Sequence, residues 1–279
     1  MSFSQKLQQA ARTNDSYLCV GLDPVSEQIP SHLGRGPHAM VAFNKAIIRA
    51  TQDIACAYKP NLGFYMLYGH DGIRALEETR RAIPDHIPVI LDAKVGDIDS
   101  TTEAYARGYF DEMRFDAVTA HPYMGKDGLA PLLKRENRCV LVLAKTSNPG
   151  SGDLQDLILS VDDSGGTVYE RVAASVVEWQ QEYGTCGVVV GATYPDELKR
   201  IRAICPDVPL LIPGVGQQEG DLEATVKAAF STGSGPVAIN ASRSIIFAGE
   251  GLDYIEAVRA AAVDHRDRIN RAARDVATA

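Results

Sequence analysis

The segment VILDAKVGDIDST, residues 89–101, starts as an apolar strand and then places Asp92, Lys94 and Asp97 within six residues. Burying charge is costly unless the charge is paired, so a strand built for a core needs a reason to end this way. Residues two apart on a strand point to one face, which predicts that Asp92 and Lys94 project together. The next two residues turn the chain, so Asp97 lies beyond the strand and could reach a neighbouring surface.

The residues after this strand predict a helix, and the same strand–helix alternation runs along the whole chain. STTE, residues 100–103, fits a capping box in which Ser100 and Glu103 cap the helix start. Apolar runs predict strands at residues 18–22, 55–59, 88–94, 116–120, 139–144, 186–191, 209–214 and 236–240. Helices are expected at residues 37–53, 69–82, 99–113, 126–134, 167–182, 195–204, 219–230 and 254–274.

The strand runs are continuously apolar rather than alternating, which is typical of parallel strands buried on both faces. Eight such strands, each followed by a helix, predict an α/β protein built as a (β/α)₈ TIM barrel. The alternative is a doubly wound open sheet, which usually carries a glycine-rich dinucleotide fingerprint after its first strand. Here the first strand leads into GLDPVSEQIP, residues 21–30, which lacks that fingerprint. Because no linker interrupts the pattern, we expect a single domain over residues 1–279.

Composition narrows the class of protein. The net charge of −8 and the lack of a Lys/Arg cluster argue against a nucleic-acid partner. No apolar run approaches the roughly 20 residues of a membrane span, and the polar N-terminus lacks the apolar core of a signal peptide. The five cysteines form no CxxC pair and indicate small buried hydrophobes in a reducing compartment rather than a zinc site. We therefore expect a cytoplasmic enzyme with no membrane partner.

A barrel carries its active site at the C-terminal ends of its strands, so the polar residues there form one candidate set. They are Asp23, Lys59, Asn61, Asp92, Lys94, His121, Lys145, Thr146, Ser147 and Asn148, with PGVGQQ (213–218) and NASRS (240–244) after the last two strands. Taken singly, each has an ordinary explanation: D-x-K as a salt bridge, His121 as a structural hydrogen-bonding group, Lys145 as a solvent-exposed loop residue. Their recurrence at strand ends that a barrel gathers predicts a charged Lys/Asp centre.

The last two strand ends predict a phosphate site. Glycines in IPGVGQQEGD, residues 212–221, expose backbone N–H groups ahead of a helix, and Arg243 adds a bidentate donor. Phosphate sites in these barrels commonly use the loops after strands seven and eight. The alternative is a glycine-rich turn beside a surface arginine. The residues alone thus indicate a barrel enzyme for a phosphorylated substrate, with its reaction open.

Several motifs together resemble one family. LDAKVGDIDST is similar to the D-x-K-x-x-D-I-x-x-T signature of the orotidine 5′-phosphate decarboxylases. CVGLDP, YKPN, TSNPG, PGVGQQ and SRSI resemble other blocks of that family in the right order, from about residue 17 to residue 250. The long segment after the fifth strand resembles the family's longer bacterial variant. Sugar-phosphate decarboxylases and hexulose-phosphate synthases share D-x-K-x-x-D and use magnesium, but YKPN and TSNPG favour the orotidylate family.

The resemblance implies decarboxylation of orotidine 5′-phosphate to uridine 5′-phosphate, the last step of pyrimidine (UMP) biosynthesis, by a carbon–carbon lyase without metal or cofactor. It implies that Lys94 protonates C6, that Asp92 lies beside the departing carboxylate, and that Lys59 joins this network. The other implied roles are Asp23 and Lys59 at the ribose, Ser147 at the pyrimidine, Gln218 and Arg243 at the phosphate, Pro213 in the substrate-binding set, and Asp97 and Thr101 in the other subunit's site of a homodimer. Gln217 takes the variable position, and His121 has no place in the family pattern.

Other readings remain open on these residues. One is a metal-dependent sugar-phosphate decarboxylase or aldolase, another a Schiff-base aldolase using Lys94, and a third a nucleotide-phosphate binding protein without catalysis. Residues 145–166 form the longest connection, and loops of that length are usually functional or mobile. We expect mobility there and over residues 215–235.

Overall fold

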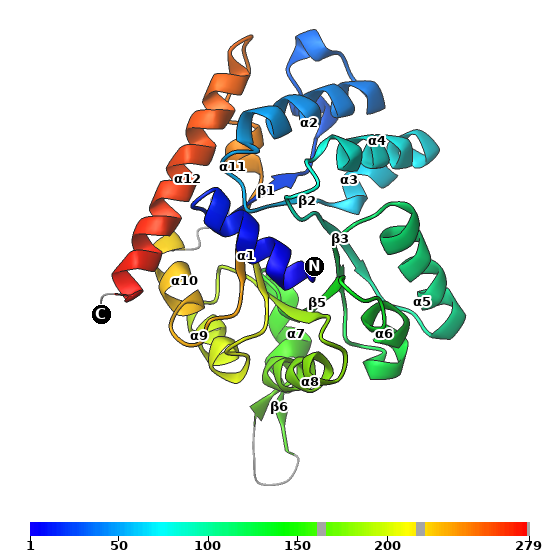
Figure 1. The fold of residues 1–279 in the computed structure, drawn as a ribbon, viewed down its shortest axis with the longest axis vertical. Helices are drawn as coiled ribbons and strands as arrows, with labels where there is room; N and C mark the ends of the chain where they lie inside the picture. Colours follow the sequence, from blue (N-terminus) through cyan, green and yellow to red (C-terminus); the bar gives the residue numbers. More distant parts are fainter. Residues whose placement is uncertain (161–165, 216–220, 278–279) are drawn as a thin grey trace.

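The computed structural model describes residues 1–160, 166–215 and 221–277. Its main sheet contains eight parallel strands in the order β2-β1-β10-β9-β8-β5-β4-β3 (Figure 1). The parallel bridges Tyr58↔Val89 and Asn61↔Asp92 join the two end strands. The strands are β1 Leu18–Leu22, β2 Ala57–Pro60, β3 Ile90–Val95, β4 Ala117–Ala120, β5 Cys139–Lys145, β8 Cys186–Val190, β9 Leu210–Pro213 and β10 Val237–Ala241. The predicted (β/α)₈ barrel is confirmed, and the open-sheet alternative is wrong.

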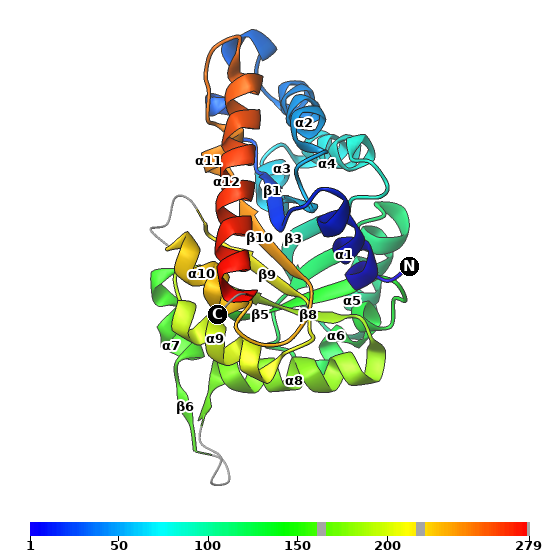
Figure 2. The same ribbon diagram turned by 60° about the vertical axis from the view of Figure 1, so that its left-hand side comes forward.

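Helices surround this barrel, as Figure 2 shows. The outer ring contains α2 Pro37–Thr51, α4 Gly69–Ala82, α5 Asp99–Ala106, α6 Gly125–Leu133, α8 Val168–Tyr183, α9 Pro195–Ile204, α10 Leu222–Ala229 and α12 Tyr254–Ala277. A π-helical stretch, Arg107–Glu112, continues α5, so the two together correspond to the one helix expected over 99–113. Short elements at the mouth side were not predicted: α3 Leu62–Met66, α7 Gly152–Gln155, α11 Arg243–Ile246, and the hairpin of β6 Ile158–Leu159 with β7 Gly166–Thr167.

The start of α5 differs from its prediction. Ile98 occupies the N-cap position in extended conformation, and no side chain caps the helix. Ser100 already lies inside the helix, so it cannot take the extended backbone that an N-cap needs. Glu103 instead accepts a hydrogen bond of 2.6 Å from Arg135. The predicted capping box is therefore wrong, because the helix begins at Asp99, two residues earlier than a cap at Ser100 requires.

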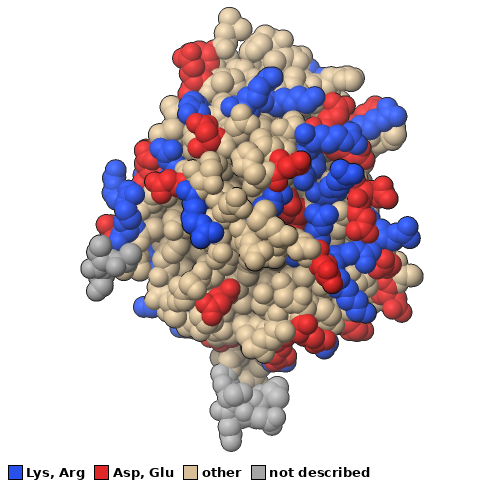
Figure 3. Space-filling model, viewed as in Figure 1, with Lys and Arg blue, Asp and Glu red and all other residues tan. Residues whose placement is uncertain are grey.

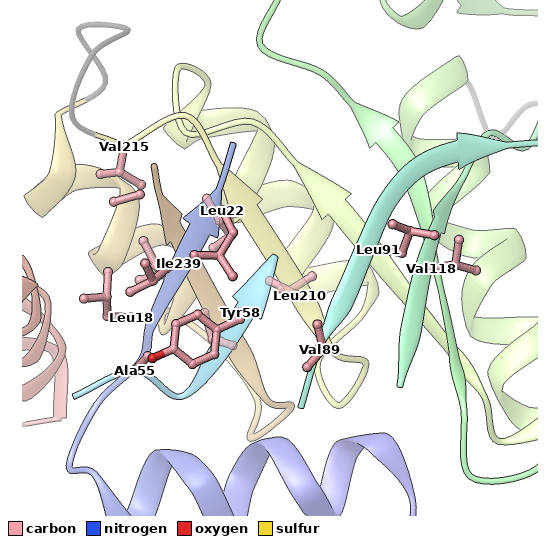
Figure 4. Packing of buried hydrophobic residues seen from close by; sticks show 14 of the residues in the cluster. Leu18, Leu22, Ala55, Tyr58, Val89, Leu91, Val118, Leu210, Val215 and Ile239 are labelled. Carbon is pink, nitrogen blue, oxygen red and sulfur yellow. The ribbon is translucent and has the colours of Figure 1, made fainter. Parts of the chain in front are cut away.

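Two apolar layers explain why the strands have no polar face. In β1, Leu18, Val20 and Leu22 belong to the layer between strands and helices, whereas Cys19 belongs to the barrel interior. Figure 4 shows side chains of the outer layer, Tyr58 among them. The hydroxyl of Tyr58 lies 2.8 Å from that of Thr51 in α2. All five cysteines are free and buried, as expected.

The N-terminal end of the barrel is closed by α1, Phe3–Thr13, which crosses it in Figure 1. Phe3 and Leu7 pack with the interior layer, and Lys6 forms a 2.7 Å ion pair with Asp116. Access to the interior is therefore left to the opposite end, where the strands have their carboxyl termini.

The face over which α1 lies carries charges of both signs. Figure 3 shows Lys and Arg side chains interspersed with Asp and Glu there, so this face presents no broad basic field of the kind that binds nucleic-acid backbones. Among the described residues, no helix combines the length and apolar character needed to cross a membrane.

Candidate active site

A cavity of about 630 Å³ opens at the C-terminal ends of the strands. Seven of the ten residues to which the family resemblance gives a site role line it together: Asp23, Lys59, Asp92, Lys94, Ser147, Pro213 and Arg243. They come from six different strand ends, which is the convergence that a barrel produces. The wall also includes Asn61, Thr119, Asn240, Ser242 and Ser244.

The carboxylate of Asp92 is the centre of the hydrogen-bond network in this cavity. Its Oδ1 accepts from Lys94 Nζ at 2.6 Å and from Thr119 Oγ1 at 2.9 Å. Its Oδ2 accepts from Lys59 Nζ and from Asn61 Nδ2, both at 3.1 Å. Four donors thus hold one carboxylate in place, and its side chain is only 11% exposed.

The charges of this network reinforce one another. Burial opposes ionisation of Asp92, but the neighbouring ammonium groups of Lys59 and Lys94 outweigh it and hold the pKa of the carboxyl well below its usual range. Burial likewise lowers the pKa of Lys59, whose side chain is 3% exposed, but Asp23 and Asp92 outweigh that effect and raise it. Both groups therefore stay ionised at neutral pH.

Lys94 reaches Asp92 through a break in β3 rather than through a regular pleat. Its φ is +49°, in the left-handed region, and the register of β3 with β4 shifts between Leu91 and Val95. The backbone N–H of Lys94 donates to Thr119 Oγ1 at 2.9 Å. A left-handed non-glycine residue is costly and persists only where its surroundings hold it, which Thr119 does here. The ammonium, on a side chain 53% exposed, consequently sits at the mouth.

Asp23 links three strands beside this centre. Its Oδ1 accepts the backbone N–H of Asn61 at 3.1 Å, and its Oδ2 accepts the hydroxyl of Ser242 at 2.6 Å. Gly21 permits the approach, because a Cβ there would lie 2.6 Å from the Cβ of Ser242. The ends of β1, β2 and β10 are thereby held at fixed separation.

Part of the set of residues predicted to bind phosphate lies within the described ranges. Gly214, with φ +100°, follows β9, and Arg243 begins α11 after β10. Arg243 and Pro213 line the same cavity as the Asp92 network. Gln217 and Gln218 lie outside the described residues.

The segment after β5 supplies a further wall. Thr146, Ser147 and Asn148 line the cavity. Ser147 packs so closely on Gly191, the residue after β8, that a Cβ there would lie 2.8 Å from the backbone nitrogen of Ser147. Lys145, for which a solvent-exposed loop position was the ordinary alternative to a site role, is fully buried. That alternative is wrong, because the following segment folds back over the Lys145 side chain and supplies Asp156 as a partner at 2.6 Å.

Two of the predicted site residues do not line this cavity. Asp97 is half-buried and its Oδ1 accepts the N–H of Ile98 at 2.8 Å, while Thr101 lies exposed on α5. His121 packs behind the same turn, where a Cβ at Gly96 would overlap its ring, and its Nδ1 has no partner among the described residues. Its position supports the turn after β3.

Two members of the network received no role from sequence reasoning. Asn61 was visible as a strand-end residue of YKPN, but its hydrogen bond to Asp92 was not. Thr119 lies inside the apolar run AVTA, where its only signal was a hydroxyl in an otherwise apolar barrel strand. Within the described ranges, no group of three or more His, Cys, Asp or Glu side chains is placed to hold a metal ion.

Comparisons with known proteins agree with one another. A family model described as "Orotidine 5'-phosphate decarboxylase / HUMPS family" matches residues 16–258. The orotidine 5′-phosphate decarboxylase of Thermomicrobium roseum is 49% identical over 277 residues, covering 99% of this chain and 98% of that protein. The orotidine 5′-phosphate decarboxylase of Herpetosiphon aurantiacus is 47% identical over 257 residues, covering 92% of this chain and 94% of that protein. The solved structure of Leishmania donovani OMP decarboxylase is similar with a TM-score of 0.82 at 39% identity, covering 98% of this chain and 99% of that one.

Proposed function

The chain belongs to the orotidine 5′-phosphate decarboxylase / HUMPS family, and from this premise we propose that it converts orotidine 5′-phosphate to uridine 5′-phosphate in pyrimidine biosynthesis. The observation that carries the proposal is the hydrogen-bonded Lys59–Asp92–Lys94 network in a cavity that Arg243 also lines. Curated relatives at 44–49% identity carry that activity in their names, which favours it over the magnesium-dependent branch of the family.

Lys94 is the group that the chemistry needs. Loss of carbon dioxide from C6 leaves an electron pair with little delocalisation into the ring, so a fixed cation and a proton source must lie beside it. The Lys94 ammonium offers both, and its 2.6 Å contact with Asp92 keeps it oriented. In the proposed step the C6–carboxylate bond breaks, its electron pair stays on C6, and Lys94 delivers a proton to that carbon.

Asp92 would act on both sides of this step. Its negative charge stabilises the two ammonium groups before reaction. A substrate carboxylate placed beside it would be repelled, and the repulsion ends when carbon dioxide leaves. No cofactor or metal enters this scheme, because the protein's own cation and proton donor supply the chemistry.

The remaining contacts divide the nucleotide among strand ends. Asp23 and Lys59 would bind the ribose, Ser147 and Pro213 the pyrimidine side, and Arg243 with Gln218 the phosphate. Binding energy from a phosphate that does not react can organise the site for catalysis.

We also propose a homodimer in which Asp97 and Thr101 serve the partner's site. Neither lines the cavity of its own chain. Exposed apolar side chains cluster on the loops and helices that follow β2, β3 and β4, which are neighbours at the mouth: Met66, Leu67, Ile98, Tyr105, Tyr123 and Met124. Apolar and aromatic side chains of this kind are enriched at interfaces.

An ultraviolet assay of orotidine 5′-phosphate decarboxylation tests the proposed function, with Lys94→Ala as the control. With the wild-type protein, the absorbance of orotidine 5′-phosphate should fall even in the presence of a chelator. With Lys94→Ala it should not fall. Loss of activity with the chelator would favour the metal-dependent rival, and trapping by borohydride with a ketose phosphate would favour the Schiff-base aldolase. Binding of uridine 5′-phosphate without any turnover would leave only a binding protein.

A further inference from the structure

Lys145, the last residue of β5, carries a buried ammonium group that the proposed chemistry does not use. Its side chain is 1% exposed, and it does not line the cavity. The ammonium lies 2.6 Å from Asp156 Oδ1 and 4.5 Å from the centroid of the Tyr194 ring. A buried ammonium without a partner is strongly unfavourable. The chain segments that supply the partners of Lys145 are therefore held in place by these contacts.

The partner comes from the segment that leaves the mouth and folds back. Residues 146–156 contain the 3₁₀ turn Pro149–Ser151 and the short helix α7. Gln155 accepts the backbone N–H of Thr146 at 2.9 Å and donates to its hydroxyl at 2.8 Å. The hydroxyl of Ser151 donates to that of Tyr194 at 3.3 Å. The returning end is thereby fastened to the residues where the segment starts.

Ser147 lies between these fastened ends. Its backbone rests against Gly191 of the neighbouring strand connection, and the residue lines the cavity. Outward movement of Asp156 would leave the buried Lys145 ammonium without its carboxylate partner. The ion pair therefore favours the closed arrangement of the segment. The position of Ser147 is linked in this way to an ion pair that never touches the cavity.

We propose that Lys145, Asp156 and Tyr194 form a latch that positions Ser147 for the base of the nucleotide. The inference rests on the proposed function, because the base end of the cavity is assigned through it. These three are positioning residues: they act through the 146–156 segment rather than on the substrate. The latch is asymmetric, since Lys145 is buried while Asp156 is 49% exposed. Loss of the carboxylate should consequently harm the site more than loss of both charges.

The test compares two ligands that share a phosphate but not a base. Asp156→Asn leaves the ammonium unpaired and favours open segments, so the dissociation constant for uridine 5′-phosphate should rise about tenfold as the competent fraction falls. Ribose 5-phosphate, which has no base, should bind within about twofold of wild type. The double variant Lys145→Met, Asp156→Asn removes the stranded charge and should recover uridine 5′-phosphate binding to within about threefold.

Glu182→Gln is the matched control, because Glu182 pairs with Lys126 at 2.9 Å on the surface with a similar exposed fraction. It should change neither dissociation constant. Calorimetric titration gives the constants, and circular dichroism checks that each variant is folded. Equal losses for the two ligands, unchanged binding in Asp156→Asn, or no recovery in the double variant would overturn the latch alone. A wild-type protein that binds no uridine 5′-phosphate would overturn both the latch and the proposed function.

Discussion

At the scale of single residues, Asp92 explains how a strand built for a core can end in charge. Its carboxylate accepts hydrogen bonds from two ammonium groups, an amide and a hydroxyl, so no charge at this strand end is buried without a partner. Burying these charges carries a desolvation penalty. Removing one member is also destabilising, because the remaining charges stay buried without their partner. A site held in this way is ready for a substrate without rearrangement of its charges.

Asp92→Asn should therefore lower the free energy of unfolding by about 3 kcal/mol at pH 7, measured by urea denaturation. The folded-state pKa of Asp92 lies below its unfolded value, so its contribution is present above about pH 4 and is lost as the pH falls further. The raised pKa of Lys59 gives a contribution present below about pH 10 and lost above it. The difference from wild type should be level between these limits.

The control for this prediction is Asp53→Asn, because Asp53 pairs with Arg259 at 2.7 Å on the surface. An exposed pair contributes at most about 1 kcal/mol, so this variant should stay close to wild type. A stability difference for Asp92→Asn that is as large at pH 3 as at pH 7 would contradict the role given to its ionised form.

Thr119 makes a second prediction at this scale, since it holds both Asp92 and the left-handed backbone of Lys94. Thr119→Val keeps the shape but removes both hydrogen bonds. If losing these hydrogen bonds raises the activation free energy by about 1.5 kcal/mol, kcat should fall roughly tenfold. Thr119→Ser keeps the hydroxyl and should restore most of the rate, whereas a defect in the Ser variant as large as that in the Val variant would contradict the role given to the hydroxyl.

At the scale of elements, the strands were predictable because the barrel buries both faces of each one. The strand expected at 139–144 spans Cys139–Lys145, and the helix expected at 195–204 has those bounds. The short α3 and α11 were missed because neither is long enough to show helical periodicity. The burial of Lys145 was missed because its partner Asp156 lies 11 residues further on, in a segment without regular spacing.

The site was predictable to the extent that it depends on strand ends. Asp23, Lys59, Asp92 and Lys94 could be grouped because a barrel gathers the carboxyl ends of its strands. The hydrogen bonds from Asn61 and Thr119 to Asp92 could not, since they depend on distances between strands rather than on spacing along one. The left-handed turn at Lys94 was equally hidden, because nothing in DAK marks a non-glycine residue with positive φ.

The contact between β1 and the turn after β10 gives a prediction at this scale. In Gly21→Ala the new Cβ would lie 2.6 Å from Ser242 Cβ, so the turn carrying Arg243 must move away from Asp23. Overpacking of this kind costs about 1–3 kcal/mol, which here should weaken substrate binding and raise KM at least about fivefold. Gly108→Ala, where a Cβ meets open space, is the control. An unchanged KM in Gly21→Ala would mean that this turn does not bind substrate.

At the scale of the whole molecule, the charge distribution sets a requirement on binding. The chain carries a net charge of −8, yet the proposed substrate is an anion. Lys59, Lys94 and Arg243 line one cavity, so attraction depends on local cations rather than on the overall field. Asp97 adds an acid at the rim that its own cavity does not use, and a second chain is the structure that would give it a site.

A mixing experiment tests that assignment at the same scale. In a heterodimer of Lys94→Ala and Asp97→Ala chains, the site that keeps its own Lys94 also receives an intact Asp97 from its partner. Heterodimers isolated with two different affinity tags should regain about half of the wild-type activity per dimer, because one of two symmetric sites is complete. Each homodimer should stay inactive or nearly so.

The control pairs Lys94→Ala with Asp92→Ala, two residues whose side chains meet within one chain. Of the two sites in that heterodimer, each lacks one member of its own network, so activity should stay low. If Asp97 served its own chain, the Lys94→Ala and Asp97→Ala heterodimer would behave like this control. A rise to about half of wild type in one mixture and not in the other therefore assigns Asp97 to the neighbouring site.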